Sequence, residues 1–374
     1  MAIDKVVSAS ITDSSVTSAK VASGVLQSNF RNIIINGDMS IAQRGTSATS
    51  IDSSNDGYLT MDRWIHIQQA DDSNTGKTSM TQSTTVPSGQ GFAKSLRIDC
   101  TTAQTSISGT NSRVVVSQRF EGQMLQYLKK GTSSAESLTC SFWVRSNKTG
   151  TYICALRDKD NSRDIAKSYT ISSADTWEKK TITFEGDTTG AFDNDNARSL
   201  DIIWGLAAGS DYSSGTLQTT WGTANNANVL VGQVNLMDST SNEWYITGVQ
   251  LEAGTSASDF EFLPFDVQLN RCYRYFHIGG ASCGRSASST GGTTYYTYPL
   301  QMRGSPSITL LDGTSIGEKA GRMHIDGISA YNITSGVIGD ANSKSCKLQH
   351  TGSGLTSGEA LGILGNPYSF ASEL

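Results

Sequence analysis

The residues that most often carry chemistry occur in this chain without forming a recognisable catalytic or metal-binding pattern. The four histidines, at positions 66, 277, 324 and 350, are scattered along the sequence. The six cysteines include no Cys-x-x-Cys pair, so neither a zinc site nor a redox motif is indicated. No phosphate-binding or dinucleotide-binding glycine motif is present. We therefore predict no catalytic residue, no metal and no cofactor, and we expect that the protein is not an enzyme.

Acidic side chains offer two further kinds of chemistry, glycoside hydrolysis and calcium binding. Hydrolysis needs two carboxylates roughly 5 to 10 Å apart, and sequence spacing cannot show this for strands that only folding brings together. Glu121, Glu243 and Asp259 are not distinguished from ordinary surface acids. The acidic stretch 187–201 has oxygen ligands for Ca²⁺ but lacks the Gly and distal Glu of an EF-hand, so we interpret it as a solvated loop.

Tryptophans could recognise sugars, because an indole face stacks on the C–H face of a pyranose ring. Trp64, Trp143, Trp204 and Trp244 stand in or beside apolar, strand-like runs, so we expect them to be buried. Trp221 lies instead in a polar loop, 219–228, with amide side chains nearby. Trp221 is therefore a candidate receptor contact.

Three tyrosines near the C-terminal end, Tyr295, Tyr296 and Tyr298, form a second aromatic group. Strand alternation would place Tyr296 and Tyr298 on the same face. Two interpretations stay open: ordinary strand packing or a contact between subunits, and contact with a receptor. Arg285 and Arg303 are further candidates for binding an anionic surface glycan, because a guanidinium matches carboxylate or phosphate in a forked geometry.

The elements that must position these residues are predominantly strands. Only 17% of the residues are charged, and 37 glycines accompany only five prolines. Short β-branched runs such as 33–35, 113–116, 138–144 and 181–184 alternate with Gly/Ser/Asn/Asp clusters that end strands. The one helix expected before residue 263 spans 122–130, with Gly131 as its stop signal. We predict an all-β chain with a two-sheet sandwich over residues 30–265.

The two ends of the chain differ from the sandwich. Residues 1–29 contain no aromatic, and an apolar residue recurs at every fifth position, at Val6, Ile11, Val16, Val21 and Leu26. Such a chain cannot exclude water alone, so it docks on another surface or stays disordered. Residues 263–276 fit either a short helix leading into a strand or one bent strand. Residues 266–374 are predicted to form a smaller β domain.

Charge and hydropathy exclude several classes of partner. The formal net charge is −5 and no run of Lys or Arg is present, which argues against nucleic acid. No stretch approaches 18 consecutive apolar residues, and the first thirty residues lack the order of a signal peptide, so we expect no membrane insertion and synthesis in the cytoplasm. Reduced, mostly buried thiols are expected.

Three motifs occur in a characteristic order: NIIINGDMSIAQRG at 32–45, DRW at 62–64 and VQLEAG at 249–254. With these motifs the chain resembles the tail-fibre and receptor-binding proteins of tailed bacteriophages. The segment LNRCYRYF at 269–276 fits the same pattern, in which it leads to a distal tip, and residues 11–24 look like the repeats that attach such fibres to the virion.

The resemblance implies a jelly-roll sandwich similar to carbohydrate-binding modules, carried on the phage tail. It also implies a homotrimer that attaches to a tail protein through residues 1–29 and contacts a host glycan or protein through residues 266–374. A threefold bundle would use one apolar residue per repeat of the arm. The alternatives are a purely structural virion component, such as a tail nozzle, collar or capsid decoration, and, less favoured, a tailspike that degrades polysaccharide.

Overall fold

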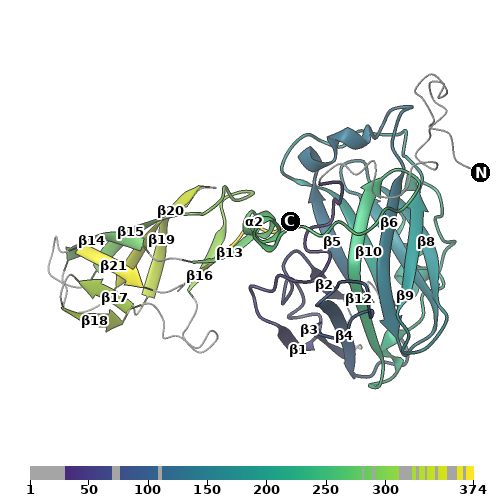
Figure 1. Ribbon diagram of the computed structural model, residues 1–374, viewed down its shortest axis with the longest axis horizontal. Coiled ribbons are helices and arrows are strands. Elements are labelled where there is room, and N and C mark those ends of the chain that lie inside the picture. Colours follow the sequence, from purple (N-terminus) through teal and green to yellow (C-terminus); the bar gives the residue numbers. More distant parts are fainter. Residues whose placement is uncertain are drawn as a thin grey trace, which may run out of the picture.

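The computed structural model describes residues 30–69, 76–107, 112–279, 282–288, 291–310, 322–325, 328–332, 335–341, 344–351, 360–364 and 368–374. Two six-stranded antiparallel sheets lie face to face and confirm the predicted all-β sandwich (Figure 1). The order in the first sheet is β1 (Ser47–Ile51), β3 (Lys77–Ser83), β4 (Ser95–Thr102), β12 (Glu243–Ala253), β6 (Leu138–Ser146) and β9 (Glu178–Phe184). The order in the second sheet is β11 (Gly222–Thr223), β8 (Arg163–Ile171), β7 (Gly150–Asp158), β10 (Arg198–Ala208), β5 (Arg113–Glu121) and β2 (Ile65–Gln69).

The core between the sheets is built from alternate residues of each strand. Trp64, Phe142 and Trp204 meet at its centre, with ring centroids 5.5 Å apart for the two indoles and 5.9 Å for Phe142 and Trp204. Trp244 is also fully buried, as expected. Trp143 differs from the prediction and is only partly buried, because its neighbours on β6 face the core and the pleat turns it to the outer face. The described free thiols, Cys100, Cys140, Cys154, Cys272 and Cys346, are buried as predicted.

The expected helix at 122–130 is wrong. The chain forms two separate 3₁₀ turns there, η3 (Gly122–Met124) and η4 (Gln126–Leu128), and Leu125 between them has φ of −112° and ψ of 0°, which interrupts a regular helix. Lys129 then adopts a left-handed conformation, with φ of 52°, and ends the second turn. The other short elements of the sandwich are α1 (Ser210–Ser213), η5 (Asn226–Asn228) and η6 (Leu236–Asp238).

The three sequence motifs are brought together by hydrogen bonds of buried side chains. Asn32 Nδ2 donates to the main-chain oxygen of Val249 (3.1 Å), and its Oδ1 accepts from the amide of Leu251 (3.0 Å). Trp64 Nε1 donates to the main-chain oxygen of Asn36 (2.9 Å). These residues therefore tie the entry segment to β12, a central strand of the first sheet.

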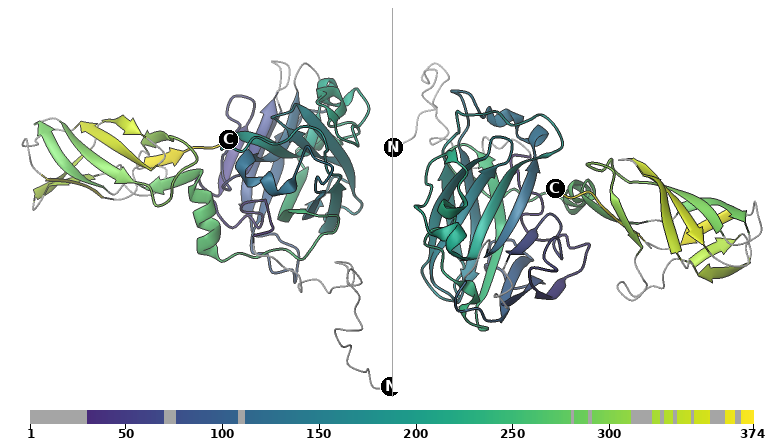
Figure 2. Two further views of the ribbon diagram at one scale, coloured as in Figure 1. Left: turned by 90° about the horizontal axis from the view of Figure 1, so that it is seen from above. Right: turned by 180° about the vertical axis from the view of Figure 1, so that it is seen from behind.

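A helix followed by a strand, one of the two structures expected for 263–276, leads out of the sandwich. The helix α2 (Phe265–Tyr273) precedes β13 (Phe276–Gly279). Among the described residues, no helix has the length and apolar character needed to span a membrane. Beyond α2 the chain forms two further sheets, which extend away from the sandwich (Figures 1 and 2).

The smaller of these sheets pairs β13 with β22 (Tyr368–Ala371) and β22 with β16 (Ser307–Leu310). The order in the seven-stranded sheet is β18 (Ile328–Asn332), β17 (Arg322–Ile325), β21 (Ala360–Leu364), β14 (Ser282–Ser288), β15 (Gly291–Thr297), β20 (Ser345–Thr351) and β19 (Ser335–Ala341). After β22, Glu373 contacts Arg44 and Arg63 of the sandwich, so the chain returns to it.

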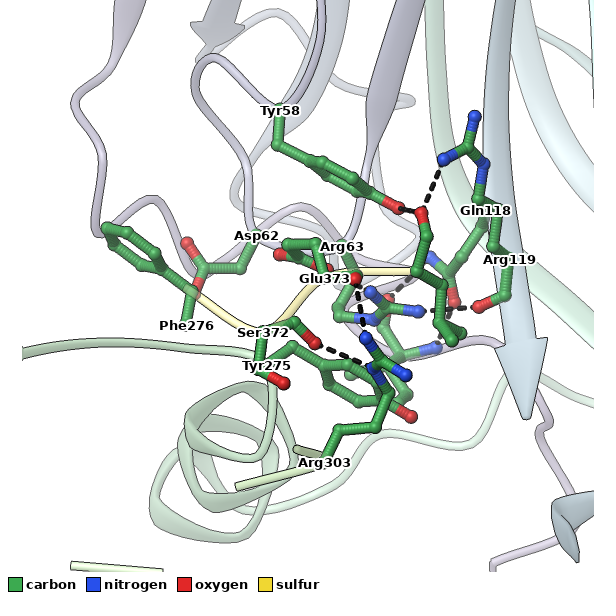
Figure 3. A network of polar contacts seen from close by, with 12 residues as sticks. Tyr58, Asp62, Arg63, Gln118, Arg119, Tyr275, Phe276, Arg303, Ser372 and Glu373 are labelled. Carbon is green, nitrogen blue, oxygen red and sulfur yellow. Dashed lines mark hydrogen bonds and ion pairs between the residues drawn. The ribbon is translucent and has the colours of Figure 1, made fainter. Parts of the chain in front are cut away.

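Residues 372–374 are fixed against the sandwich by arginines. Arg63, which is 1% exposed, pairs with the carboxylate of Glu373, and Arg44 Nη2 lies 3.0 Å from Glu373 Oε1. Arg303 donates through Nε to the main-chain oxygen of Ser372 (2.8 Å). Figure 3 shows these groups converging on the returning segment. The distal sheets are thus joined to the sandwich at both ends, through α2 and through this C-terminal contact.

Glu373→Gln should lower the free energy of unfolding by about 3 kcal/mol, because it leaves the guanidinium of Arg63 buried without its counter-charge. Urea unfolding measures this change. Glu136→Gln is the matched control, because the pair of Lys129 and Glu136 is solvent-exposed, with side chains 55% and 39% exposed, and should cost less than about 1 kcal/mol. Equal effects of the two variants would contradict the structural role given to Glu373.

His66 gives a pH-dependent prediction. Its imidazole is fully buried, with Nε2 3.1 Å from Thr78 Oγ1, and burial lowers its pKa from 6.5 to about 4. Between pH 6.5 and pH 4 the imidazole is therefore protonated in the unfolded chain and neutral in the folded chain. The free energy of unfolding falls as the pH drops through this range, by on the order of 3 kcal/mol.

His66→Gln should remove this part of the acid sensitivity when urea unfolding is compared at pH 7 and pH 4.5. His277 remains in the variant and leaves a residual slope, since burial lowers its pKa to about 4 as well. An unchanged difference between the two pH values would show that His66 is not the titrating group.

Candidate functional site

The outer face of the second sheet, which points away from the core, is divided into a covered half and an open half. Residues 209–234 cross the covered half, where Tyr212, Val229 and Leu230 pack on Ile153 and Ala155. The open half is hollowed into a cleft of about 330 Å³, which we call the sheet cleft. Its lining consists of Asp56, Ile65, Ile67, Gln69, Arg113, Val115, Ser117, Arg119, Arg157, Lys159, Arg198, Asp201 and Ile203. This volume falls at the lower end of the roughly 300 to 1,000 Å³ typical of small-ligand sites.

Strand register places opposite charges side by side in the cleft. Arg119 on β5 is paired with Asp201 on β10, which in turn is paired with Arg157 on β7. Arg157 donates through Nε and Nη2 to the carboxylate of Asp164, at 2.7 and 2.9 Å. Arg198 donates through Nε to Asp201 Oδ1 at 2.6 Å. Arg157 and Arg198 are therefore each matched by a carboxylate.

Arg113, Arg119 and Lys159 differ, because no Asp or Glu carboxylate of the described residues lies within ion-pair distance of them. The guanidinium of Arg113 lies over the ring of Tyr212, 4.5 Å from its centroid. Nε of Arg113 and Nε of Arg119 are buried and have no hydrogen-bond partner among the described residues. Burial lowers the pKa of Arg113, and burial together with the nearby Arg198 lowers the pKa of Lys159. Positive charge is thus concentrated in the cleft without full compensation.

Two arginines on the outer face of the first sheet, in contrast, are compensated by carboxylates. Arg97 and Arg145 contact the two oxygens of Glu243 at 2.8 and 2.9 Å. Tyr245 donates its hydroxyl to Glu243 (2.8 Å), and Arg97 also pairs with Asp99 (2.6 Å). The two outer faces of one sandwich therefore differ in charge, which distinguishes the sheet cleft.

Trp221 lies outside the cleft. Its indole packs partly buried against the main core and donates through Nε1 to the main-chain oxygen of Glu185 (2.7 Å). The ammonium of Lys130 lies 5.7 Å from its ring centroid. These contacts use one face and the N–H group of the indole.

The three tyrosines predicted as receptor contacts occupy different environments on and beside β15. Tyr295 is exposed, with 64% of its surface accessible. Tyr296 stacks between His277 and Phe370, with centroids 5.8 and 5.1 Å away. Tyr298 is 5% exposed. Of the three, Tyr295 presents the largest open surface to a receptor.

The remaining predicted contacts are placed as follows. Arg303 lies at the contact of residues 372–374 with the sandwich, which we call the junction. Its Nη1 donates to the main-chain oxygen of Asn196 (3.1 Å) and its Nη2 to that of Glu373 (2.9 Å). Arg285 lies on β14, and its side chain is outside the described ones. The arm residues Val6, Ile11, Val16, Val21 and Leu26 also lie outside the described residues.

Two of the acids considered for hydrolysis, Glu121 and Glu243, are engaged in ion pairs. Glu121 accepts from Arg274 Nε and Nη2 at 2.7 and 2.6 Å, which lowers its pKa against the effect of burial. Asp187 and Asp201 are buried and paired with arginines, so the solvated-loop interpretation fails for them and holds for the exposed residues 193–196. No group of three or more metal-ligating side chains occurs within the described ranges.

The sheet cleft itself was missed from the sequence. Alternation along 113–119 does indicate that Arg113, Val115, Ser117 and Arg119 share one face. Their neighbours in the cleft, such as Ile65 and Ile203, come from strands far away in the sequence. Without the strand pairing, the charged face could not be recognised as a cleft.

No protein-family model matches the chain. No curated protein matches it in sequence. The structure has a distant similarity to an enzymatically active domain of tailspike protein 4 of bacteriophage CBA120, with 13% identity and a TM-score of 0.30, over 60% of this chain and 22% of that one. It is also similar to a family 4 carbohydrate-binding module (10% identity, TM-score 0.29, covering 58% of this chain and 97% of the module).

A family 11 carbohydrate-binding module of a cellulosomal cellulase of Clostridium thermocellum is a third similar structure. The identity is 12% and the TM-score 0.27, over 56% of this chain and 97% of the module. At such values none of these likenesses bears on function, so function has to be inferred from the chain's own residues.

If the chain is a phage fibre protein, as the resemblance of its motifs implies, and its distal sheets contact the receptor, Tyr295→Ala should weaken adsorption by up to a few kcal/mol, the usual range for an interface anchor. The exposed ring leaves folding unaffected in this variant. The adsorption rate constant measures the effect, and the melting temperature shows that the fold is intact. Adsorption at the wild-type rate with an unchanged melting temperature would remove Tyr295 from the receptor contacts.

Proposed function

We propose that this chain is a receptor-binding protein of a tailed-bacteriophage fibre, held on the virion through residues 1–29 and binding a glycan on the host surface. The observation that carries the proposal is the sheet cleft, an open hollow on a rigid sheet with cations that lack carboxylate partners. Binding sites are commonly concave and contain a few polar groups that orient the ligand, and the cationic side chains of the cleft supply such groups here.

The order of the three motifs supports the fibre assignment, and their mutual hydrogen bonds explain why they occur together. In this proposal the chain is a component of the virion. The distal sheets, which extend from the sandwich, offer a second surface to the host through Tyr295 (Figure 1).

The proposed activity is binding without catalysis. A glycosidase needs a protonated carboxyl group as general acid near neutral pH. Hydrogen bonds from Arg274 and Tyr275 lower the pKa of Glu121, and hydrogen bonds from Tyr245 and Arg145 lower that of Glu243, in both cases against the effect of burial. Both acids are therefore ionised at neutral pH, which suits structural ion pairs.

A structural virion component is the second candidate. The observation that favours it is the junction, where Arg63, Arg44 and Arg303 hold the returning segment and make the sandwich and the distal sheets one continuous body. A spacer needs this rigidity and needs no receptor.

Competition with adsorption separates the two candidates. Purified full-length protein should slow adsorption of the phage that carries it, in proportion to its concentration, because it occupies the same receptors. Heat-denatured protein is the control. A folded protein that leaves the adsorption rate unchanged at concentrations far above that of the virions would favour the structural component.

Residues 1–29 provide a test of attachment and of assembly. We propose that Val6, Ile11, Val16, Val21 and Leu26 lie along the axis of a homotrimer or at its docking site on a tail protein. Removal of residues 1–29 should leave the melting temperature of the sandwich unchanged and abolish incorporation into virions. Light scattering that shows a stable full-length monomer at micromolar concentration, or virions that still incorporate the shortened protein, would contradict this role.

A further inference from the structure

The charge in the sheet cleft is opposite to that of the whole chain. Five cationic side chains and two carboxylates line the cleft, whereas the chain carries a formal net charge of −5. Ion pairs with Asp164 and Asp201 account for Arg157 and Arg198. Arg113 and Arg119, both on β5, and Lys159, which directly follows β7, remain.

The second carboxylate of the cleft does not neutralise these cations. Asp56 Oδ2 accepts a hydrogen bond from the amide of Gln68 (2.9 Å), and no ion pair forms between Asp56 and a described cation. Burial raises the pKa of Asp56, and the neighbouring Arg113 and Arg119 oppose this effect. An anion entering the cleft therefore meets a positive potential from three side chains and a single competing acid.

The cleft also lacks what a neutral sugar needs. No aromatic residue belongs to its lining, so no ring is available there for stacking on a pyranose. Its polar groups are mainly donors, because guanidinium and ammonium groups cannot accept hydrogen bonds. Nε of Arg113 and Nε of Arg119 are buried N–H groups that no described residue satisfies. Acceptors with negative charge complement such a surface.

We propose that the sheet cleft binds an acidic saccharide, whose carboxylate or phosphate is held by Arg113, Arg119 and Lys159. This inference rests on the proposed glycan-binding function and adds the charge of the ligand. The acidic group of the sugar takes the place of the missing carboxylate partner. A hydrogen bond to Leu374 fixes the position of the Arg119 guanidinium, because the main-chain oxygen of Leu374 accepts from Arg119 Nη1 and from the hydroxyl of Tyr58 (Figure 3).

The test uses a printed array of bacterial capsular, O-antigen and teichoic acid polysaccharides, probed with the full-length protein. Bound polysaccharides should be acidic. Chemical reduction of their carboxyl groups, or removal of their phosphates with hydrofluoric acid, should abolish binding, and the treatment that succeeds identifies which acid is recognised. Raising the NaCl concentration should weaken binding.

Two variants locate the site. Lys159→Ala removes an exposed ammonium group and Arg113→Ala removes the guanidinium over Tyr212, and each should raise the dissociation constant about tenfold or more, the usual effect of losing a charged hydrogen bond. Lys179→Ala is the matched control, because Lys179 is an exposed lysine on β9 of the opposite sheet. It should bind as the wild type does. Melting temperatures show that each variant is folded, and Lys159→Ala remains informative if Arg113→Ala is unstable.

Three outcomes would overturn the inference, and they can be told apart. If neutral polysaccharides bind to the wild type and this binding is lost in Lys159→Ala, the glycan-binding function is kept and the acidic nature of the ligand is refuted. Acidic polysaccharides that bind equally to wild type, Lys159→Ala and Arg113→Ala would place the site elsewhere on the chain. Binding to no polysaccharide on the array, with slowed phage adsorption in the competition experiment, would refute the saccharide and point to a protein receptor.

Discussion

The alternation of β5 between the core and the outer face is the constraint on which the rest of the site depends. Val114, Val116 and Phe120 fill the space between the sheets, so the residues between them must point outward. β5 lies between β10 and β2 in the second sheet. Its outward residues, Arg113, Val115, Ser117 and Arg119, therefore line the cleft between these two strands. A slip of one residue in register would bury Arg113 and Arg119 in the core, which the cost of burying unpaired charge forbids.

The cleft and the junction are physically connected. Arg119 lines the cleft and donates to the main-chain oxygen of Leu374, while the adjacent Glu373 is held by Arg63 and Arg44. Residues 372–374, which follow the distal sheets, therefore lie beside the cleft. The proposed glycan site is thus at the base of the distal sheets, so that the cleft and the distal sheets would contact the same host envelope.

Much of the fold could be predicted from the sequence, because strand and turn patterns are local. β-Branched runs and glycine-rich turns predicted the sandwich, whereas the expected burial of Trp143 was wrong, because strand alternation turns its side chain to the outer face while Phe142 points inward. The helix at 122–130 failed because tertiary contacts and a left-handed Lys129 outweighed its apolar periodicity. The site was predictable only in part: an exposed Tyr295 can be anticipated, but the meeting of Arg113, Lys159 and Ile65 depends on pairing between distant strands.

The most direct measurement is a crystal or cryo-EM structure of the full-length protein with an acidic oligosaccharide from its host bound. The account predicts a sugar in the sheet cleft, with its acidic group within hydrogen-bond distance of Arg113 or Arg119. A well-occupied sugar found only on the distal sheets, with an empty cleft on the second sheet, would contradict it.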